Sequence, residues 1–159
     1  MPPEAAGGYR TEVAMYQVVL VPLDGSKRAE AILPHVEELA GRHQAQVVLL
    51  QVIELVSDVS YMAGASFDLS QGTFTRWTTE AEDYLTSIQG KFREKGIETR
   101  TRVEIGPVVE TIITVAEGEG ADLIAMASHG RTGLSRVFYG SVAAGVLQRV
   151  DRPLLLIRS

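Results

Sequence analysis

The chain has 159 residues, of which 45% are hydrophobic and 22% are charged, a composition typical of one folded domain and not of a disordered chain. The absence of cysteine excludes disulfides, thiolate metal sites and cysteine nucleophiles, and 3 histidines are too few and too scattered to suggest a metal cluster. The formal net charge is −5, whereas sequence-independent nucleic-acid binding requires an excess of basic residues.

Residues 1–15 are predicted to form a flexible N-terminal tail, and residues 16–159 a single domain. The tail carries Glu4 and Glu12 and has no apolar core segment, so we do not expect a signal peptide. No apolar run approaches the roughly 18 residues of a membrane span. We therefore expect a cytoplasmic protein without a membrane partner.

The first half of the domain begins with two apolar, β-branched runs at Gln17–Leu23 and Gln46–Ile53, which predict buried strands. Between them, apolar residues recur at helical spacing from residue 29 to residue 40. Pro34 lies inside that helix, where we expect a kink. Residues 54–73 are polar and irregular, which predicts a long loop.

The second half continues the alternation of helices and strands. Apolar residues at a 3.6-residue period predict a helix from Phe74 to Phe92 that packs on a sheet, and an aromatic ligand pocket is the alternative. The alternating pattern of Glu98–Glu104 predicts an edge strand with one solvated face. The next helix opens with Pro107 in its first turn. The remaining elements are a buried strand at Asp122–Ala127, a glycine-rich loop at Ser128–Tyr139, a helix near Ser141–Arg149 and a last strand at Pro153–Ile157.

Strictly alternating strands and helices imply an α/β fold with a parallel sheet and helices on both faces. Ligands bind such sheets beyond the carboxyl ends of the strands, where the strand order switches. Two segments have suitable residues there: Pro22–Ser26 after the first strand and Ala127–Ser141 after the fourth.

The second of these segments runs into a helix start at Gly140 and Ser141. Unpaired backbone N–H groups and the positive end of the helix dipole suit a phosphate there. The preceding loop adds two glycines that allow bending and two arginines that add positive charge: Gly130, Gly133, Arg131 and Arg136. The residues alone are equally consistent with a glycine-rich turn and an ordinary serine cap.

Other nucleotide-binding and catalytic motifs are absent. The chain contains no G-x-x-x-x-G-K-[ST], no G-x-G-x-x-G after its first strand and no G-x-S-x-G. A triad of Asp24, Ser128 and His129 is disfavoured, because adjacent serine and histidine side chains point in different directions. His129 is instead interpreted as a loop or pocket-wall residue.

The segment from Ala127 to Ser141 resembles the universal stress protein family, whose ATP-binding branch carries G-x-x-G, nine residues and then G-[ST]. Here Ala127 occupies the first glycine position, Gly130 the second, and Gly140-Ser141 follow after nine residues. The flanking DLIAMASHGRTGLSRVFYGSVAAGVLQRVDRPLLLIR and VVLVPLDGS are also similar to the family's blocks, with Asp24 at its acidic position. The resemblance covers about Tyr16–Arg158.

This resemblance implies a five-stranded parallel sheet in the order 3-2-1-4-5, Rossmann-like and similar to the adenine nucleotide alpha-hydrolases. Its switch point lies between the first and fourth strands. The residues implied to line the nucleoside part of the pocket are Pro22, Leu23, Asp24, Val52, Met126 and Ala127. Val52 would meet adenine through its backbone, and Met126 and Ala127 would flank the ribose.

The resemblance also implies a phosphate end of the pocket, where the ligand would be ATP. Mg²⁺ would accompany the phosphates, held largely by phosphate oxygens and water. The residues implied to hold the phosphates or lie beside them are His129, Gly130, Arg131, Gly140, Ser141 and Val142.

The leading functional hypothesis is a regulatory protein that senses ATP or a related adenine nucleotide as a homodimer paired through its last strand. We expect no dedicated enzymatic activity, and slow ATP hydrolysis is compatible with this hypothesis. One alternative is a nucleotide-free protein-interaction module of the same fold, which Ala127 favours; another is a binder of AMP or cyclic AMP. A pyrophosphatase or ligase is disfavoured, because Asp24-Gly25-Ser26 is too sparse for the Ser/Gly-rich motif of those enzymes.

Overall fold

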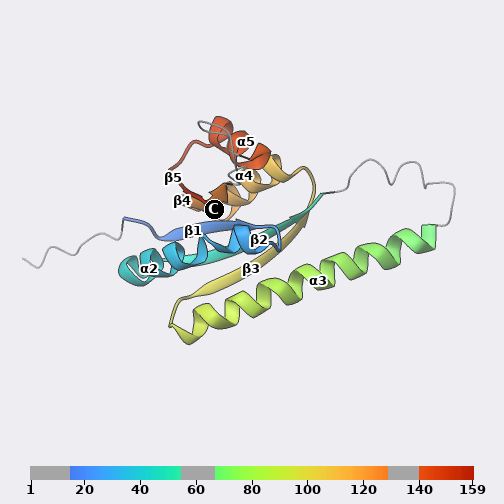
Figure 1. Ribbon diagram of the computed structural model, residues 1–159, viewed down its shortest axis with the longest axis horizontal. Coiled ribbons are helices and arrows are strands. Elements are labelled where there is room, and N and C mark those ends of the chain that lie inside the picture. The colour runs from blue at the N-terminus through green and yellow to red at the C-terminus, as the bar shows by residue number, and fades with distance from the viewer. Residues whose placement is uncertain (1–14, 55–66, 129–139) are drawn as a thin grey trace, which may run out of the picture.

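A computed structural model describes residues 15–54, 67–128 and 140–159, so almost all of the predicted N-terminal tail lies outside it. Five strands form one parallel sheet in the order β3-β2-β1-β4-β5 (Figure 1), which confirms the expected order. The strands are β1 (Val18–Leu23), β2 (Gln46–Ile53), β3 (Thr99–Ile105), β4 (Leu123–Ser128) and β5 (Leu154–Arg158).

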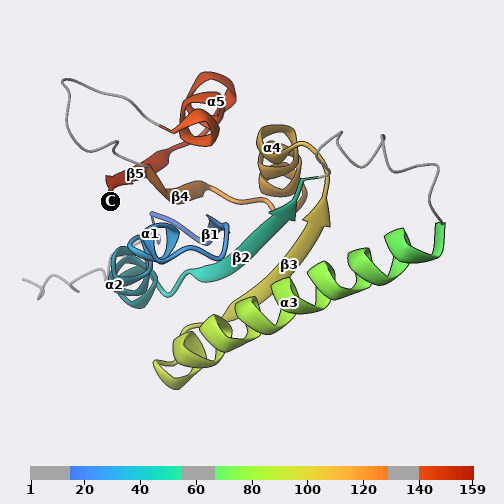
Figure 2. The ribbon, with the colours of Figure 1, turned by 45° about the vertical axis from the view of Figure 1, so that its right-hand side comes forward.

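Helices cover both faces of the sheet, as the alternating element order predicts (Figure 2). On one face lie α1 (Lys27–Glu30), α2 (Leu33–His43) and α3 (Phe67–Glu94), and on the other lie α4 (Val108–Gly118) and α5 (Ser141–Arg149). Successive strand residues point to opposite faces. Val19 and Val21 therefore pack under α1–α3, whereas Leu20 packs under α4 and α5.

Pro34 does not kink one continuous helix, as the sequence predicted, but separates two. The helix α1 ends at Glu30, and α2 begins at Leu33 with Pro34 in its first turn. Proline lacks the N–H that would bond to the carbonyl four residues earlier, and its ring clashes with that carbonyl. The first turn of a new helix removes both costs, because no N–H is needed there.

The predicted loop at residues 54–73 is wrong over residues 67–73, which belong to the 28-residue helix α3. Residues 55–66 of that loop lie outside the described part of the chain. The helix contains no proline, and Gly72 costs only about 1 kcal/mol within it. Its other half packs on the sheet through Ala81, Leu85 and Phe92, which confirms the predicted apolar stripe.

The first turns of α3 extend beyond the ends of β2 and β3 (Figures 1 and 2). At 1.5 Å per residue, the whole helix is about 42 Å long. Residues without a sheet beneath them need no apolar periodicity, and Gly72 and Thr73, which precede the predicted helix, are exposed. None of the helices in the described ranges combines the length and apolar character of a membrane span.

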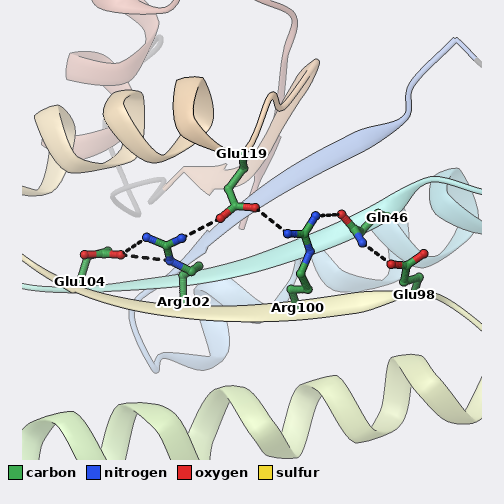
Figure 3. Close-up of polar contacts among 6 residues, drawn as sticks. All are labelled: Gln46, Glu98, Arg100, Arg102, Glu104 and Glu119. Atoms are coloured by element: carbon green, nitrogen blue, oxygen red, sulfur yellow. Dashed lines mark hydrogen bonds and ion pairs between the residues drawn. The ribbon is translucent and has the colours of Figure 1, made fainter.

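Charged side chains cover the β3 edge of the sheet (Figure 3). Glu119, at the end of α4, accepts a hydrogen bond from Arg102 at 2.8 Å and pairs with Arg100 at 3.2 Å. Arg102 also donates to Glu104, which raises the pKa of the guanidinium above its usual value. Charges of this kind discourage pairing with another sheet edge, so β3 is a poor candidate for contact between copies.

Glu119→Gln should lower the free energy of unfolding by about 1 kcal/mol, because this carboxylate is only 10% exposed and holds two arginines. Glu117, two residues earlier in α4, is exposed and supplies the matched control Glu117→Gln. Urea unfolding of both variants at low salt measures the difference. Equal midpoints for the two variants would contradict a stabilising role for the network.

Candidate functional site

The β1 and β4 strands separate at their carboxyl ends, where the strand order switches. Their ladder pairs Val19 with Leu123 and Leu20 with Ile124, whereas β1 pairs with β2 along its whole length to Leu23. A crevice at this point is the usual ligand site of an open α/β sheet. The registers therefore place an opening between Leu23 and the end of β4.

A cavity of about 180 Å³ occupies this end of the sheet, on the face covered by α4 and α5. It brings together every predicted site residue that the structure describes, from three strands, the β1–α1 turn and the start of α5. These residues are Pro22, Leu23, Asp24, Val52, Met126, Ala127, Gly140, Ser141 and Val142. The predicted residues His129, Gly130 and Arg131 lie outside the described residues.

Five further residues line the cavity and were missed from the sequence: Ala29, Leu50, Val108, Ile112 and Ala143. Leu50 could have been found, because it lies two residues before Val52 in the same strand and therefore faces the same side. Val108 and Ile112 are four residues apart on α4 and share one helix face. Only the packing of α4 over the sheet brings that face to the cavity.

Most of the cavity wall is apolar, and Asp24 is the only charged side chain among its described lining residues. Asp24 Oδ1 accepts a hydrogen bond from the backbone N–H of Ser26 at 2.9 Å. Ser26 Oγ in turn accepts from the Ala29 N–H at 3.1 Å and caps α1. This pair of bonds orients an exposed carboxylate at the mouth of the cavity.

The N-terminus of α5 forms the opposite end of the cavity, with Gly140 as its N-cap. The N-cap glycine has no side chain to bond the first helical N–H groups, and these groups together with the helix dipole favour an anion. Gly140 has φ −56° and ψ 158°, which any residue can adopt. Glycine is therefore not required there for its conformational freedom.

The described residues of the cavity provide no metal site made of protein ligands alone. Within residues 15–54, 67–128 and 140–159, no group of three or more His, Asp or Glu side chains could hold a metal ion. Mg²⁺ binds readily through one or two carboxylates, water and substrate phosphates. The residues present therefore fit a magnesium ion only as the companion of a phosphate ligand, with Asp24 as the available carboxylate.

The fold and the apolar crevice at its switch point place this protein in the general class of doubly wound α/β domains that bind ligands at the carboxyl ends of their strands. The model of the universal stress protein family matches residues 15–158. The chain belongs to that family, and its fold is that of the adenine nucleotide alpha-hydrolase-like proteins.

Similarity to known proteins extends over nearly the whole chain. Universal stress protein MJ0577 of Methanocaldococcus jannaschii is 28% identical over 155 residues, covering 91% of this chain and 96% of the relative. The solved structure of MJ0577 has a TM-score of 0.77 at 30% identity and covers 91% of this chain and 97% of that chain.

Two other solved members of the family contain nucleotides. One is a universal stress protein in complex with cAMP, with a TM-score of 0.63, 20% identity and coverage of 90% of this chain and 97% of that chain. The other, from Archaeoglobus fulgidus, is in complex with dAMP, with a TM-score of 0.62, 19% identity and coverage of 91% and 98%. At these identities, the likeness to this chain shows the fold alone.

Proposed function

We propose that this protein is a regulatory universal stress protein of the ATP-binding branch, which binds ATP or a related adenine nucleotide. The observation that carries the proposal is a single cavity that joins apolar walls to a helix N-terminus whose N-cap residue is a glycine. The apolar walls suit a base, and the helix terminus suits a phosphate. Two relatives that bind adenine nucleotides support the same ligand class.

The nucleoside lies at the strand ends in this proposal. Val52 meets adenine through its backbone, Met126 and Ala127 flank the ribose, and Asp24 accepts a hydrogen bond from a ribose hydroxyl or the adenine amine. The cavity volume of about 180 Å³ is below the roughly 300–1,000 Å³ of common ligand sites. It therefore suits the nucleoside part, with the phosphates extending along the start of α5.

The phosphates meet the N–H groups at Ser141 and Val142, and Mg²⁺ neutralises part of their charge when bound. His129, Gly130 and Arg131 complete the phosphate end in the proposal. Asp24 is the only ionisable group among the described lining residues, and an exposed carboxylate is a weak base for activating water. We therefore propose nucleotide sensing as the function, with any ATP hydrolysis slow.

Calorimetry of the purified full chain tests this function. ATP with Mg²⁺ should bind at least about tenfold more tightly than adenosine, because one charge-assisted hydrogen bond from the helix terminus contributes about 1.5–3 kcal/mol. AMP and cAMP titrations identify how many phosphate groups are recognised. Adenosine binding as tightly as ATP would remove phosphate recognition from the proposal.

A nucleotide-free interaction module remains the second candidate, and Ala127 is the observation that favours it. Its methyl group lies on the cavity wall, where the ATP-binding motif of the family has glycine. If that methyl group blocks the ribose, no adenine nucleotide or nucleoside should bind in calorimetry. The purified protein should then also carry no co-purified nucleotide and show no excess absorbance at 260 nm.

Asp24→Ala should weaken ATP binding by about 1–3 kcal/mol, the contribution of a charge-assisted hydrogen bond. The Asp24 carboxylate is exposed and therefore hydrated in the free protein. Its contribution to ATP affinity must come from the hydrogen bond to the ligand itself. Asp24→Asn is the matched control, because its amide oxygen can still accept from the Ser26 N–H. Unchanged ATP affinity in a folded Asp24→Ala protein would remove Asp24 from the site.

We also propose a homodimer paired through β5, which is an edge strand of the sheet. Its apolar residues from Leu154 to Ile157 are only half-buried within one chain, unlike the charged β3 edge, and such an edge favours pairing with another strand. Sedimentation at tens of micromolar should give twice the chain mass of 17.3 kDa. A mass of 17.3 kDa would reject the dimer.

A further inference from the structure

A second cavity lies at the same end of the sheet but on its opposite face. It has a volume of about 340 Å³ and is lined by Gly25, Gln51, Trp77, Glu80, Ala81 and Tyr84. Gln51 lies in β2 between Leu50 and Val52, whose side chains line the first cavity. Because strand residues alternate between faces, Gln51 points toward α3, and the sheet separates the two cavities.

Two buried polar atoms at this second cavity find no hydrogen-bond partner of ordinary geometry among the described residues. Gln51 Oε1 and the Tyr84 hydroxyl are shielded from solvent, and neither has a hydrogen-bond partner of ordinary geometry in the described part of the chain. Buried polar groups are nearly always paired, because an unpaired one loses its hydration without compensation. An amide oxygen only accepts hydrogen bonds, so a group that completes Gln51 must be a donor.

The electrostatics of the cavity favour a positive charge. Glu80 lines it, and no basic side chain does so among the described residues. Burial raises the pKa of the Tyr84 hydroxyl, and the charge of Glu30, the approach of the hydroxyl to that carboxylate and the charge of Asp24 raise it further. A hydroxyl that donates toward Glu30 keeps its oxygen lone pairs free to accept. A guanidinium from the same helix already sits at the Glu80 carboxylate, with Arg76 Nε 3.1 Å from Glu80 Oε1.

An aromatic side chain forms another part of the wall. Trp77 is half-buried and meets Phe74 edge to face, with ring centroids 6.0 Å apart. Tryptophan is the aromatic residue that attracts cations most strongly through its ring face. Acceptor atoms, a carboxylate and an indole ring thus surround one small space, and all three favour the same ligand chemistry.

We propose that this cavity binds a small organic cation with N–H donors, an alkylammonium or guanidinium group. Gln51 Oε1 and the Tyr84 hydroxyl accept its hydrogen bonds, Glu80 balances its charge, and Trp77 packs against it. Arg76 competes with the ligand for Glu80. None of the residues that line this cavity belongs to the proposed phosphate end. Cation binding here can therefore be tested separately from nucleotide binding.

Trp77 is the only tryptophan in the chain, so its fluorescence reports this cavity directly. The full chain is titrated with methylguanidinium chloride at constant ionic strength, and with methylurea as a neutral analogue of the same shape. Methylguanidinium should change the Trp77 emission saturably, and methylurea should not at the same concentrations. No saturable change, or equal changes with both compounds, would overturn the proposal.

Substitutions then locate the binding. Gln51→Met removes the buried acceptor and Glu80→Gln removes the charge, and each should weaken methylguanidinium binding about five- to tenfold. Arg76→Gln should strengthen it a few-fold by removing the competing guanidinium. Glu82→Gln, an exposed position on the same helix, is the matched control and should leave the affinity unchanged. Equal weakening by Glu82→Gln and Glu80→Gln would show a general charge effect and reject this cavity as the site.

Discussion

Gly140→Val should reduce ATP affinity at least about tenfold while leaving adenosine affinity nearly unchanged. Gly140 caps α5 in an extended conformation that valine also adopts, so the substitution requires no strained backbone. The added isopropyl group instead fills the space through which a phosphate approaches the first N–H groups of the helix. A tenfold loss corresponds to about 1.4 kcal/mol of binding free energy.

Two neighbouring substitutions serve as comparisons for Gly140→Val. Ser141→Ala removes one hydroxyl but leaves the backbone donors, so its effect on ATP affinity should be smaller. Ala127→Gly adds room at the ribose, and ATP should bind equally well or more tightly. Calorimetry with ATP and adenosine measures all three variants, and circular dichroism checks that α5 is kept. If Gly140→Val lowered the affinities for ATP and adenosine equally, the substitution would be disturbing the whole pocket.

Gly145→Val should lower the free energy of unfolding by about 2–3 kcal/mol, near the upper end of overpacking costs. Gly145 lies in α5 where that helix crosses α4, and a Cβ placed there would be 2.7 Å from Val109 Cγ2. Valine is short and branched, so Val109 cannot move aside as a long side chain could. The two helices must separate, which also disturbs the cavity wall that both of them form.

The matched control is Gly90→Val in α3, where a Cβ would meet no atom within 4 Å. Both glycines lie inside helices, so backbone propensity changes equally and only the contact differs. Denaturant unfolding should therefore show a near-neutral Gly90→Val. Combining Gly145→Val with Val109→Ala should recover part of the loss, as a double-mutant cycle measures. Equal effects at positions 90 and 145 would contradict close packing of α4 on α5.

Short buried strands and well-marked helix ends could be predicted from residues alone. β2 spans Gln46–Ile53 and α5 spans Ser141–Arg149, both as predicted, because each is an apolar pattern bounded by breakers. Pro34 was also recognised as an interruption, but whether it kinks one helix or separates two depends on how Leu33 and Val36 pack. α3 was predicted too short, because its first turns carry no periodic apolar face.

The candidate site shows the same division. The loop chemistry of Asp24 and of Gly140-Ser141 is local, so these residues could be selected from the sequence together with the family resemblance. Leu50, Val108 and Ile112 have no local signal that separates a cavity wall from ordinary core. Their place in the cavity depends on α4 packing over β2 and β1 separating from β4, which are contacts between distant segments.

The sequence by itself determined the α/β class, the alternation of elements and the residues at the two strand ends where a ligand site was expected. These features follow from hydrophobic period, glycine and proline, which act over a few residues. Only the tertiary structure decided which apolar side chains line the first cavity, and that Gln51 Oε1 and the Tyr84 hydroxyl lie buried beside Trp77 and Glu80 without a hydrogen-bond partner of ordinary geometry among the described residues. Burial and hydrogen-bond satisfaction depend on the atoms that the fold brings together from distant positions, and no local pattern contains that information.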